Sequence, residues 1–243
     1  MPADNSVPAG SGPAHDARHG PLPALLLLLT TVTGIVDAVS YLKLGHVFVA
    51  NMTGNVVFLG FAAGGASDFS VVAVLAAAAS FLAGALAGGR LGVTAGQHRG
   101  RFLALASYMQ VGLIGAALAV SLIDANLNSA ISAYALIVPL GLAMGLQNAA
   151  ARRLGVPDLT TTVLTLTLTG LSADSKLAGG NSPNAGRRLL ATAAMLIGAT
   201  LGALLIFHVA LSAALALAFV LLLVNAGVGC RLSSSTEPWT LAK

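Results

Sequence analysis

Long apolar segments separated by short polar connections occupy most of the chain. They are residues 22–42, 71–89, 102–123, 130–150 and 189–229. A helix of about 20 residues crosses the hydrocarbon core of a bilayer. The first four segments have roughly that length, whereas the last is about twice as long and must fold back once, which we place near His208. The pattern therefore predicts six transmembrane helices.

Two further apolar segments, residues 47–64 and 159–173, are shorter or more polar than a lipid-facing helix. If both crossed the membrane, the 12 Lys and Arg residues would divide 6 against 6. If neither crosses and the N-terminus is cytoplasmic, 11 lie inside and 1, Lys43, lies outside. Because the positive-inside rule favours the second arrangement, we expect an all-α integral membrane protein. It would have six net crossings, two broken or re-entrant segments and both termini in the cytoplasm.

The composition excludes a soluble globular domain. Only 8% of the residues are charged and 56% are apolar, and the mean hydropathy is +0.88, whereas soluble domains carry about 25% charged residues. The net charge of +4 is small and dispersed, so it does not indicate a nucleic-acid partner. We divide the chain into a disordered cytoplasmic tail at 1–20, a single transmembrane domain at 21–229 and a cytoplasmic tail at 230–243.

The two weak segments occupy equivalent places in the two halves of the chain, which indicates an internal repeat. The predicted halves are residues 22–123 and 130–229. With one deletion allowed, Gly34 and Asp37 align with Gly145 and Asn148, and each half contains a span, a broken segment and two further spans. Three crossings is an odd number, so the second half would be inverted, as in many secondary transporters. The alternative is that sequence rich in Ala, Gly and Leu aligns with itself easily.

Asp37 is the only carboxylate that falls clearly within a predicted span. A carboxylate there costs several kcal/mol unless it is paired, hydrogen-bonded, protonated or hydrated, so a functional role is the default hypothesis. We interpret Asp37 as a protonatable or cation-binding group. The alternative is a position at the outer interface, where Asp37 would share solvated headgroup space with Lys43.

The first weak segment contains a cluster of polar side chains, Asn51, Thr53 and Asn55, with Gly54 among them. Carboxamides and a hydroxyl, together with backbone carbonyls freed by a broken helix, would suit the coordination of a cation or a small polar solute. The alternative is a polar network that only joins helices, at about 1 kcal/mol per hydrogen bond.

The second weak segment contains a run of threonines. Within 164–169 they alternate with leucines as in a strand, but Thr162, Thr165 and Thr169 also share one face of a helix. The Pro-Asp pair at 157–158 is a helix-opening signal. A short helix pointing into the protein and an extended piece both remain open. The candidate residues for substrate binding or coupling are Asp37, Asn51, Thr53, Asn55, Asn148, Thr162, Thr165 and Thr169.

Three pairs of glycines have GxxxG spacing. They are Gly84 and Gly88, Gly141 and Gly145, and Gly198 and Gly202. Such pairs let helix backbones approach closely because side-chain bulk is missing at i and i+4. They indicate tight packing within the chain, and they would serve a homodimer interface equally well.

The sequence does not predict an enzyme. It has no HExxH, GxSxG or Walker A motif and no GxGxxG following a strand. None of its 5 histidines is paired at metal-ligand spacing within a span. Cys230 is the single cysteine, so a disulfide within the chain is excluded. We therefore expect neither a cofactor nor a metal.

Three stretches carry a resemblance to a known family. They are TGIVDAVSY at 33–41, VFVANMTGN at 47–55 and GLQNAAARRLGVPDLTTT at 145–162. Over residues 22–228 the chain resembles the YoaK-like family of multi-pass bacterial membrane proteins, and NMTGN and RLGVPDLTTT are specific stretches. The resemblance implies a bacterial inner-membrane protein. It supplies neither a substrate nor a catalytic residue.

Two functions from different classes fit these observations. The first is a small-solute secondary transporter or permease whose site lies between the two broken segments, with Asp37 as a proton-coupling group. The second is a membrane scaffold or partner-binding subunit in which the polar clusters and GxxxG faces only organise helices. An enzyme acting on lipid comes third and would need a second acid or base near Asp37. The expected partners are the lipid bilayer, an unknown small polar solute or ion and, through the GxxxG faces, a second copy of the chain.

Overall fold

The computed structural model describes residues 18–66, 70–124, 129–182 and 184–241, so most of the predicted tail at 1–20 lies outside the described residues. Within these ranges the protein is all-helical, with eight α-helices and two short 3-10 helices. The α-helices are α1 (Leu22–Lys43), α2 (Met52–Ala63), α3 (Val71–Ala95), α4 (Arg99–Ile123), α5 (Ala130–Leu154), α6 (Thr165–Ala173), α7 (Ala185–His208) and α8 (Leu211–Leu232). The 3-10 helices are Lys176–Ala178 and Pro238–Thr240.

Among the described residues, six helices are long and apolar enough to cross a membrane: α1, α3, α4, α5, α7 and α8. They confirm the six predicted spans. The long apolar segment 189–229 breaks where expected, because α7 ends at His208 and α8 begins at Leu211. Helices are the expected structure for such segments, since lipid offers no hydrogen-bond partner and a helix satisfies its own backbone.

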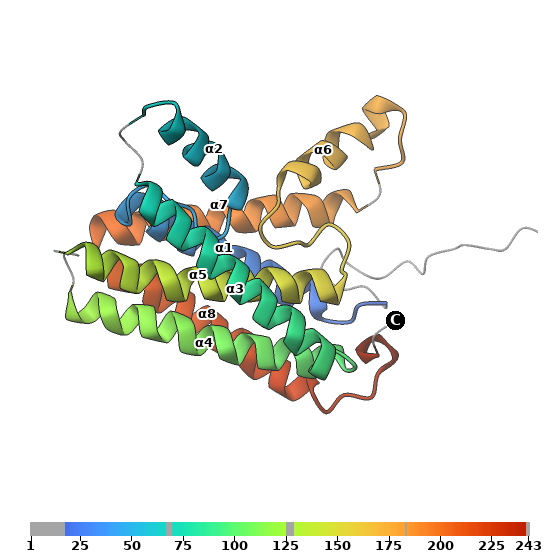
Figure 1. Ribbon diagram of the computed structural model, residues 1–243. Helices are drawn as coiled ribbons and strands as arrows, with labels where there is room; N and C mark the ends of the chain where they lie inside the picture. Colours follow the sequence, from blue (N-terminus) through green and yellow to red (C-terminus); the bar gives the residue numbers. More distant parts are fainter. Residues whose placement is uncertain (1–17, 67–69, 125–128, 183, 242–243) are drawn as a thin grey trace, which may run out of the picture.

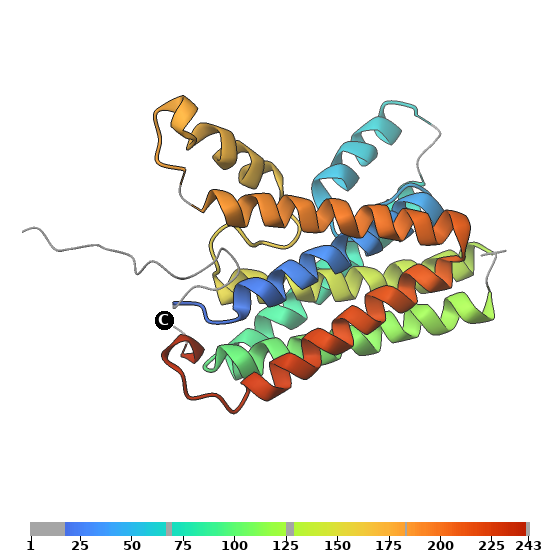
Figure 2. The same ribbon diagram turned by 180° about the vertical axis from the view of Figure 1, so that it is seen from behind.

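The long helices lie side by side, and α2 and α6 project from one side of the bundle (Figures 1 and 2). The largest helix contacts join α1 to α7, α3 to α5, and α4 to α8. Further contacts join α5 to α4 and α1 to α8. The first long helix of each half therefore packs along the second long helix of the other half, so the two halves are interleaved.

Glycines allow the two closest of these approaches. A Cβ atom at Gly34 on α1 would lie 2.6 Å from the backbone nitrogen of Ala199 on α7, and one at Gly145 on α5 would lie 2.8 Å from that of Ala85 on α3. Added Cβ atoms would also meet neighbouring helices at Gly84, Gly88, Gly141, Gly198 and Gly202. The GxxxG faces are thus occupied inside the chain. The homodimer that the sequence left open stays a prediction, since these contacts concern a single chain.

Buried polar side chains join the helices at two further places. The Gln147 amide on α5 donates to the Thr33 hydroxyl on α1 at 2.7 Å. The Asn225 amide on α8 donates to the Leu25 carbonyl of α1 at 2.9 Å, and its oxygen accepts from the Ser107 hydroxyl of α4 at 3.0 Å. In a membrane, where lipid does not drive helices together, such bonds and close packing supply the association.

Part of the predicted C-terminal tail packs against the start of α4. His98 caps this helix, because its Nδ1 accepts from the Arg101 amide at 3.1 Å, and its Nε2 donates to the Ser235 carbonyl at 2.8 Å. The Arg99 guanidinium donates to the carbonyls of Trp239 and Leu154. The beginning of α4, the end of α5 and the residues after α8 therefore meet at one end of the bundle.

Candidate functional site

Two non-helical segments lead from long helices into the short ones. Residues 44–51 join α1 to α2, and residues 155–164 join α5 to α6. Gly45 (φ 86°) and Gly155 (φ 60°) have left-handed backbone near the start of each segment, which glycine adopts without steric cost. In Figure 1, α2 and α6 begin near the middle of the bundle and diverge towards its opposite ends. Each segment therefore returns the chain to the middle before the short helix leads out again.

The segment before α2 is held by two side chains. The Asp37 carboxylate on α1, 8% exposed, accepts from the Ala50 amide at 3.1 Å. Asn55 on α2 accepts from the Phe48 amide at 2.9 Å and donates to the Phe48 carbonyl at 2.6 Å. The Phe48 ring also stacks on Tyr41 with ring centroids 5.0 Å apart. Asp37 and Asn55 thus fix the position from which α2 starts.

Replacement of Asn55 by alanine is expected to lower the free energy of unfolding by about 2 kcal/mol, because the backbone N–H and C=O of Phe48 lose their partner. Thermal unfolding of the purified protein measures the change. The exposed neighbour Asn51, replaced by alanine, is the matched control and should leave stability nearly unchanged. Equal stability of the two variants would contradict the role given to Asn55.

The segment before α6 is held in a corresponding way from α5. The Thr162 hydroxyl donates to the Asn148 carboxamide oxygen at 2.7 Å, and the Asn148 nitrogen donates to the Met144 carbonyl at 3.3 Å. Asn148 aligns with Asp37 in the sequence repeat. Asp37 and Asn148 therefore have corresponding contacts, because each binds the segment that follows its own helix.

The prediction that a helix starts at residues 157–158 is wrong. These residues form a turn in which Asp158 has φ 63°, and α6 begins only at Thr165. The turn brings the Asp158 carboxylate to 2.9 Å from Arg188 on α7. Arg188 also lies 2.7 Å from Asp174, which follows α6. One arginine thus holds both ends of the second weak segment, residues 159–173. The sequence did not reveal this, because its partners lie 30 and 14 residues away.

A cavity of about 360 Å³ lies where the starts of α2 and α6 meet. It is lined by Ala50, Asn51, Met52, Thr53, Gly54, Phe81, Asn148, Thr162, Val163, Leu164, Thr165 and Met195. These residues come from both weak segments and from three long helices. The expected location of a site, between the two broken segments, therefore contains a cavity.

Five of the eight candidate residues line this cavity, namely Asn51, Thr53, Asn148, Thr162 and Thr165. The other three do not. Asp37 contacts the cavity wall only indirectly, because it binds the backbone of Ala50, which lines the cavity. Asn55 faces the backbone of Phe48 instead. Thr169 is exposed on α6.

The sequence did not indicate two apolar residues that line the cavity, Phe81 on α3 and Met195 on α7. Phe81 stands three positions before Gly84 and Met195 three before Gly198, and these two glycines are the first members of GxxxG pairs in the two predicted halves. In the predicted repeat they would be equivalent residues of the two halves. The register of the repeat was a signal from which both could have been found.

The lining combines polar side chains with helix starts. Among the described residues, no charged side chain lines the cavity. Neither α2 nor α6 has a side-chain cap at its start, and the first N–H groups of a helix have no partner within the helix. Over the same part of the chain, no group of three or more His, Cys, Asp or Glu side chains could hold a metal ion. The cavity can thus offer hydroxyl, carboxamide and backbone groups to a solute.

Residues 25–228 match the family described as Protein of unknown function (DUF1275). The chain belongs to this family. The match extends from α1 to near the end of α8, so the family region contains both short helices and every residue that lines the cavity. This match and the YoaK relative described next confirm the YoaK-like resemblance inferred from the sequence motifs.

This DUF1275 protein is also similar to the UPF0700 transmembrane protein YoaK of Bacillus subtilis (strain 168). The two are 35% identical over 150 residues, which cover 62% of this chain and 65% of the relative, slightly less than two thirds of its length. No solved structure matches the chain. Together with the six long apolar helices, these comparisons identify a multi-pass integral membrane protein.

Proposed function

We propose that this protein is a small-solute secondary transporter or permease of the bacterial inner membrane, and that the cavity between α2 and α6 is its solute site. The observation that carries the proposal is the cavity itself, about 360 Å³ in volume and lined by polar residues of both halves. Transporters bind solutes near the middle of the membrane, where discontinuous helices expose backbone groups to a cavity.

The packing supports an inverted repeat of three plus three crossings. The contact of α1 with α7 is the contact of α5 with α3 repeated in the other half. Asp37 and Asn148 each bind the segment that follows their own helix, and Phe81 and Met195 both line the cavity. Because each half makes an odd number of crossings, the halves run in opposite directions across the membrane. Rocking of one half against the other would then open the cavity to alternate sides.

In this proposal the two weak segments are re-entrant, and both termini face the cytoplasm. The end of the bundle where α4 begins and α5 ends carries Arg99, Arg101, Arg152 and Arg153, as the positive-inside rule requires of a cytoplasmic face. The helix α6 would then lead from the cavity towards the cytoplasm, and α2 towards the outside.

The chemistry of the lining supports a polar solute with hydrogen-bond acceptors. The carboxamides of Asn51 and Asn148 and the hydroxyls of Thr53 and Thr165 can donate to such a solute. The starts of α2 and α6 add backbone N–H groups and the positive ends of two helix dipoles. Small organic acids, amino acids and nucleobases share these acceptor groups, so they are the first compounds to test.

Asp37 supplies a route for proton coupling. It differs from the equivalent Asn148 in being able to bind a proton, and its hydrogen bond to Ala50 connects it to the cavity wall. Protonation would remove the negative charge that attracts the Ala50 amide and would weaken this bond. The position of the first segment would therefore respond to the protonation of Asp37.

The proposal is tested with the variant Thr162→Val, which keeps the shape of the side chain but removes its bond to Asn148. Thermal unfolding is measured with ions, nucleobases, amino acids and organic acids, and flux of each stabilising compound is measured in proteoliposomes. A ligand stabilises only the state that it binds. We expect a compound that stabilises the original protein, and loss of both stabilisation and flux in Thr162→Val.

The matched control is Thr30→Val, which loses only a bond to the Leu26 carbonyl of the same helix. It should retain both stabilisation and flux. Flux that is unchanged in Thr162→Val would contradict the assignment of the cavity. Stable co-purification with another membrane protein, with no stabilising solute and no flux, would overturn the proposal in favour of a scaffold.

A further inference from the structure

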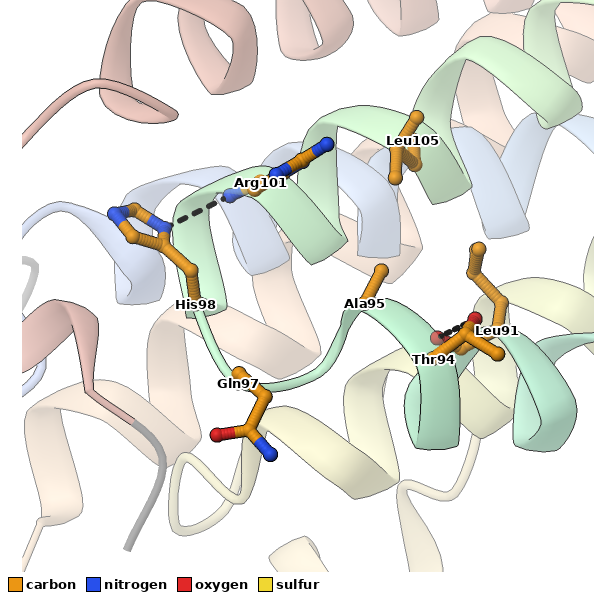
Figure 3. A pocket seen from close by; sticks show the side chains of 7 residues that line it. All are labelled: Leu91, Thr94, Ala95, Gln97, His98, Arg101 and Leu105. Atoms are coloured by element: carbon orange, nitrogen blue, oxygen red, sulfur yellow. Dashed lines mark hydrogen bonds between the residues drawn. The ribbon is translucent and has the colours of Figure 1, made fainter.

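A second cavity, of about 380 Å³, lies between the last turns of α3 and the first turns of α4, at the basic end of the bundle (Figure 3). We call it the α3–α4 cleft. Its lining includes Leu91 and Ala95 of α3, Gln97 of the connecting turn, and Arg101 and Leu105 of α4. Figure 3 shows Leu91, Ala95 and Leu105 directed into the space between the two helices.

The cleft is polar at one end and apolar at the other. Gln97 and Arg101 lie at or near the turn, where the chain leaves the bundle. Leu91 stands one helical turn before Ala95, and Leu105 one turn after Arg101, so both leucines lie deeper along the bundle. In a membrane these ends correspond to the headgroup region and to the hydrocarbon.

The polar end offers donors that the protein does not use itself. His98 is occupied, because both of its ring nitrogens are hydrogen-bonded. The guanidinium of Arg101 and the carboxamide of Gln97 have no hydrogen-bond partner within the described part of the chain. No acidic side chain lines the cleft over the same residues. A cation with free donors beside an apolar wall matches the charge and the polarity of an anionic lipid.

We propose that the α3–α4 cleft binds one anionic phospholipid of the cytoplasmic leaflet. Arg101 and Gln97 donate to its phosphate, and one acyl chain lies along Leu91 and Leu105. Arginine suits this role because its donors match the geometry of phosphate oxygens. Basic clusters at the cytoplasmic face also attract anionic headgroups of the inner leaflet.

The test uses the full-length protein in nanodiscs of phosphatidylcholine, with and without phosphatidylglycerol. We expect phosphatidylglycerol to raise the unfolding temperature and to remain bound when the protein is released for native mass spectrometry. Arg101→Gln should weaken the retained binding about fivefold, the loss expected for one basic residue near an anionic surface. Ala95→Leu, which fills the cleft and keeps the charge, should weaken it as well.

Arg152→Gln is the matched control, because Arg152 is exposed at the same end of the bundle but does not line the cleft. It should retain the lipid. Equal losses in Arg101→Gln and Arg152→Gln would overturn the proposal, because they would indicate general attraction to a basic surface. Equal stabilisation by glycerol phosphate, which has no acyl chain, would overturn the lipid assignment as well.

Discussion

Replacement of Gly145 by alanine is expected to destabilise the protein strongly, because the added methyl group would meet the backbone of a neighbouring helix. The added Cβ would meet the carbonyl oxygen of Phe81 and lie 2.8 Å from the nitrogen of Ala85. Both contacts are backbone atoms of α3, so no side chain can rotate away and the helices must separate. Overpacking of this kind costs about 3 kcal/mol. Thermal unfolding and the yield of monodisperse protein measure the effect.

Gly34→Ala tests the repeat in the same experiment. Gly34 is equivalent to Gly145, and its added Cβ would meet the carbonyl oxygen of Met195 and lie 2.6 Å from the nitrogen of Ala199. The two variants should therefore lose similar stability. If only one of them is destabilised, the two helix contacts are not equivalent and the repeat loses its main support.

Gly112 and Gly227 provide controls within membrane helices, since a Cβ at either would meet no atom within 4 Å. Alanine at these positions should leave stability unchanged or raise it slightly, by up to about 1 kcal/mol from helix propensity. Unfolding of Gly145→Ala at the same temperature as Gly112→Ala would contradict the close contact of α3 with α5.

Replacement of Asp37 by asparagine is expected to abolish proton-driven uptake, down to the level of empty liposomes, and to leave the fold intact. Asparagine retains an oxygen that can accept from the Ala50 amide, but it cannot exchange a proton. Solute binding and solute exchange without a proton gradient should persist, because Asp37 does not line the cavity. Uptake under an imposed proton gradient, compared with exchange, measures the difference.

Two further variants separate the possible causes of such a loss. Asp37→Leu leaves the buried Ala50 amide without an acceptor, so stability should also fall, by about 1–3 kcal/mol. Asp174→Asn changes an acid that does not line the cavity and should retain proton-driven uptake. Normal uptake by Asp37→Asn would exclude Asp37 as the coupling group. It would not contradict the assignment of the cavity as the solute site, which Thr162→Val tests.

The sequence located the candidate site better than it assigned roles within it. The repeat indicated Asn148 and the threonine run indicated Thr162, and the structure joins them by a hydrogen bond at 2.7 Å. The polar cluster of the first weak segment indicated Asn55, but its side chain faces the backbone of Phe48 and not the cavity. Composition and spacing do not reveal which way a side chain points when the helix that carries it starts in an irregular segment.

Residues that act through distant partners could not be found from the sequence. Arg188 counted only as a basic residue that favours the cytoplasmic side, whereas it holds Asp158 and Asp174 at the two ends of the second weak segment. The 157–158 pair was interpreted as a helix start because the local pattern favours one. The ion pair with α7 instead accompanies a turn with left-handed backbone, an example of tertiary contacts that override a local preference.

The sequence by itself determined the membrane class, the six long helices and the break after His208. These properties follow from local hydropathy, because lipid requires continuous apolar helices of a set length. Only the tertiary structure decided that α1 packs on α7 and α3 on α5, with the GxxxG glycines at these contacts. It also decided that the starts of α2 and α6 meet around one cavity. All six long helices are similarly apolar, so hydropathy cannot select partners, which depend on where glycines and buried polar groups of distant segments fit together.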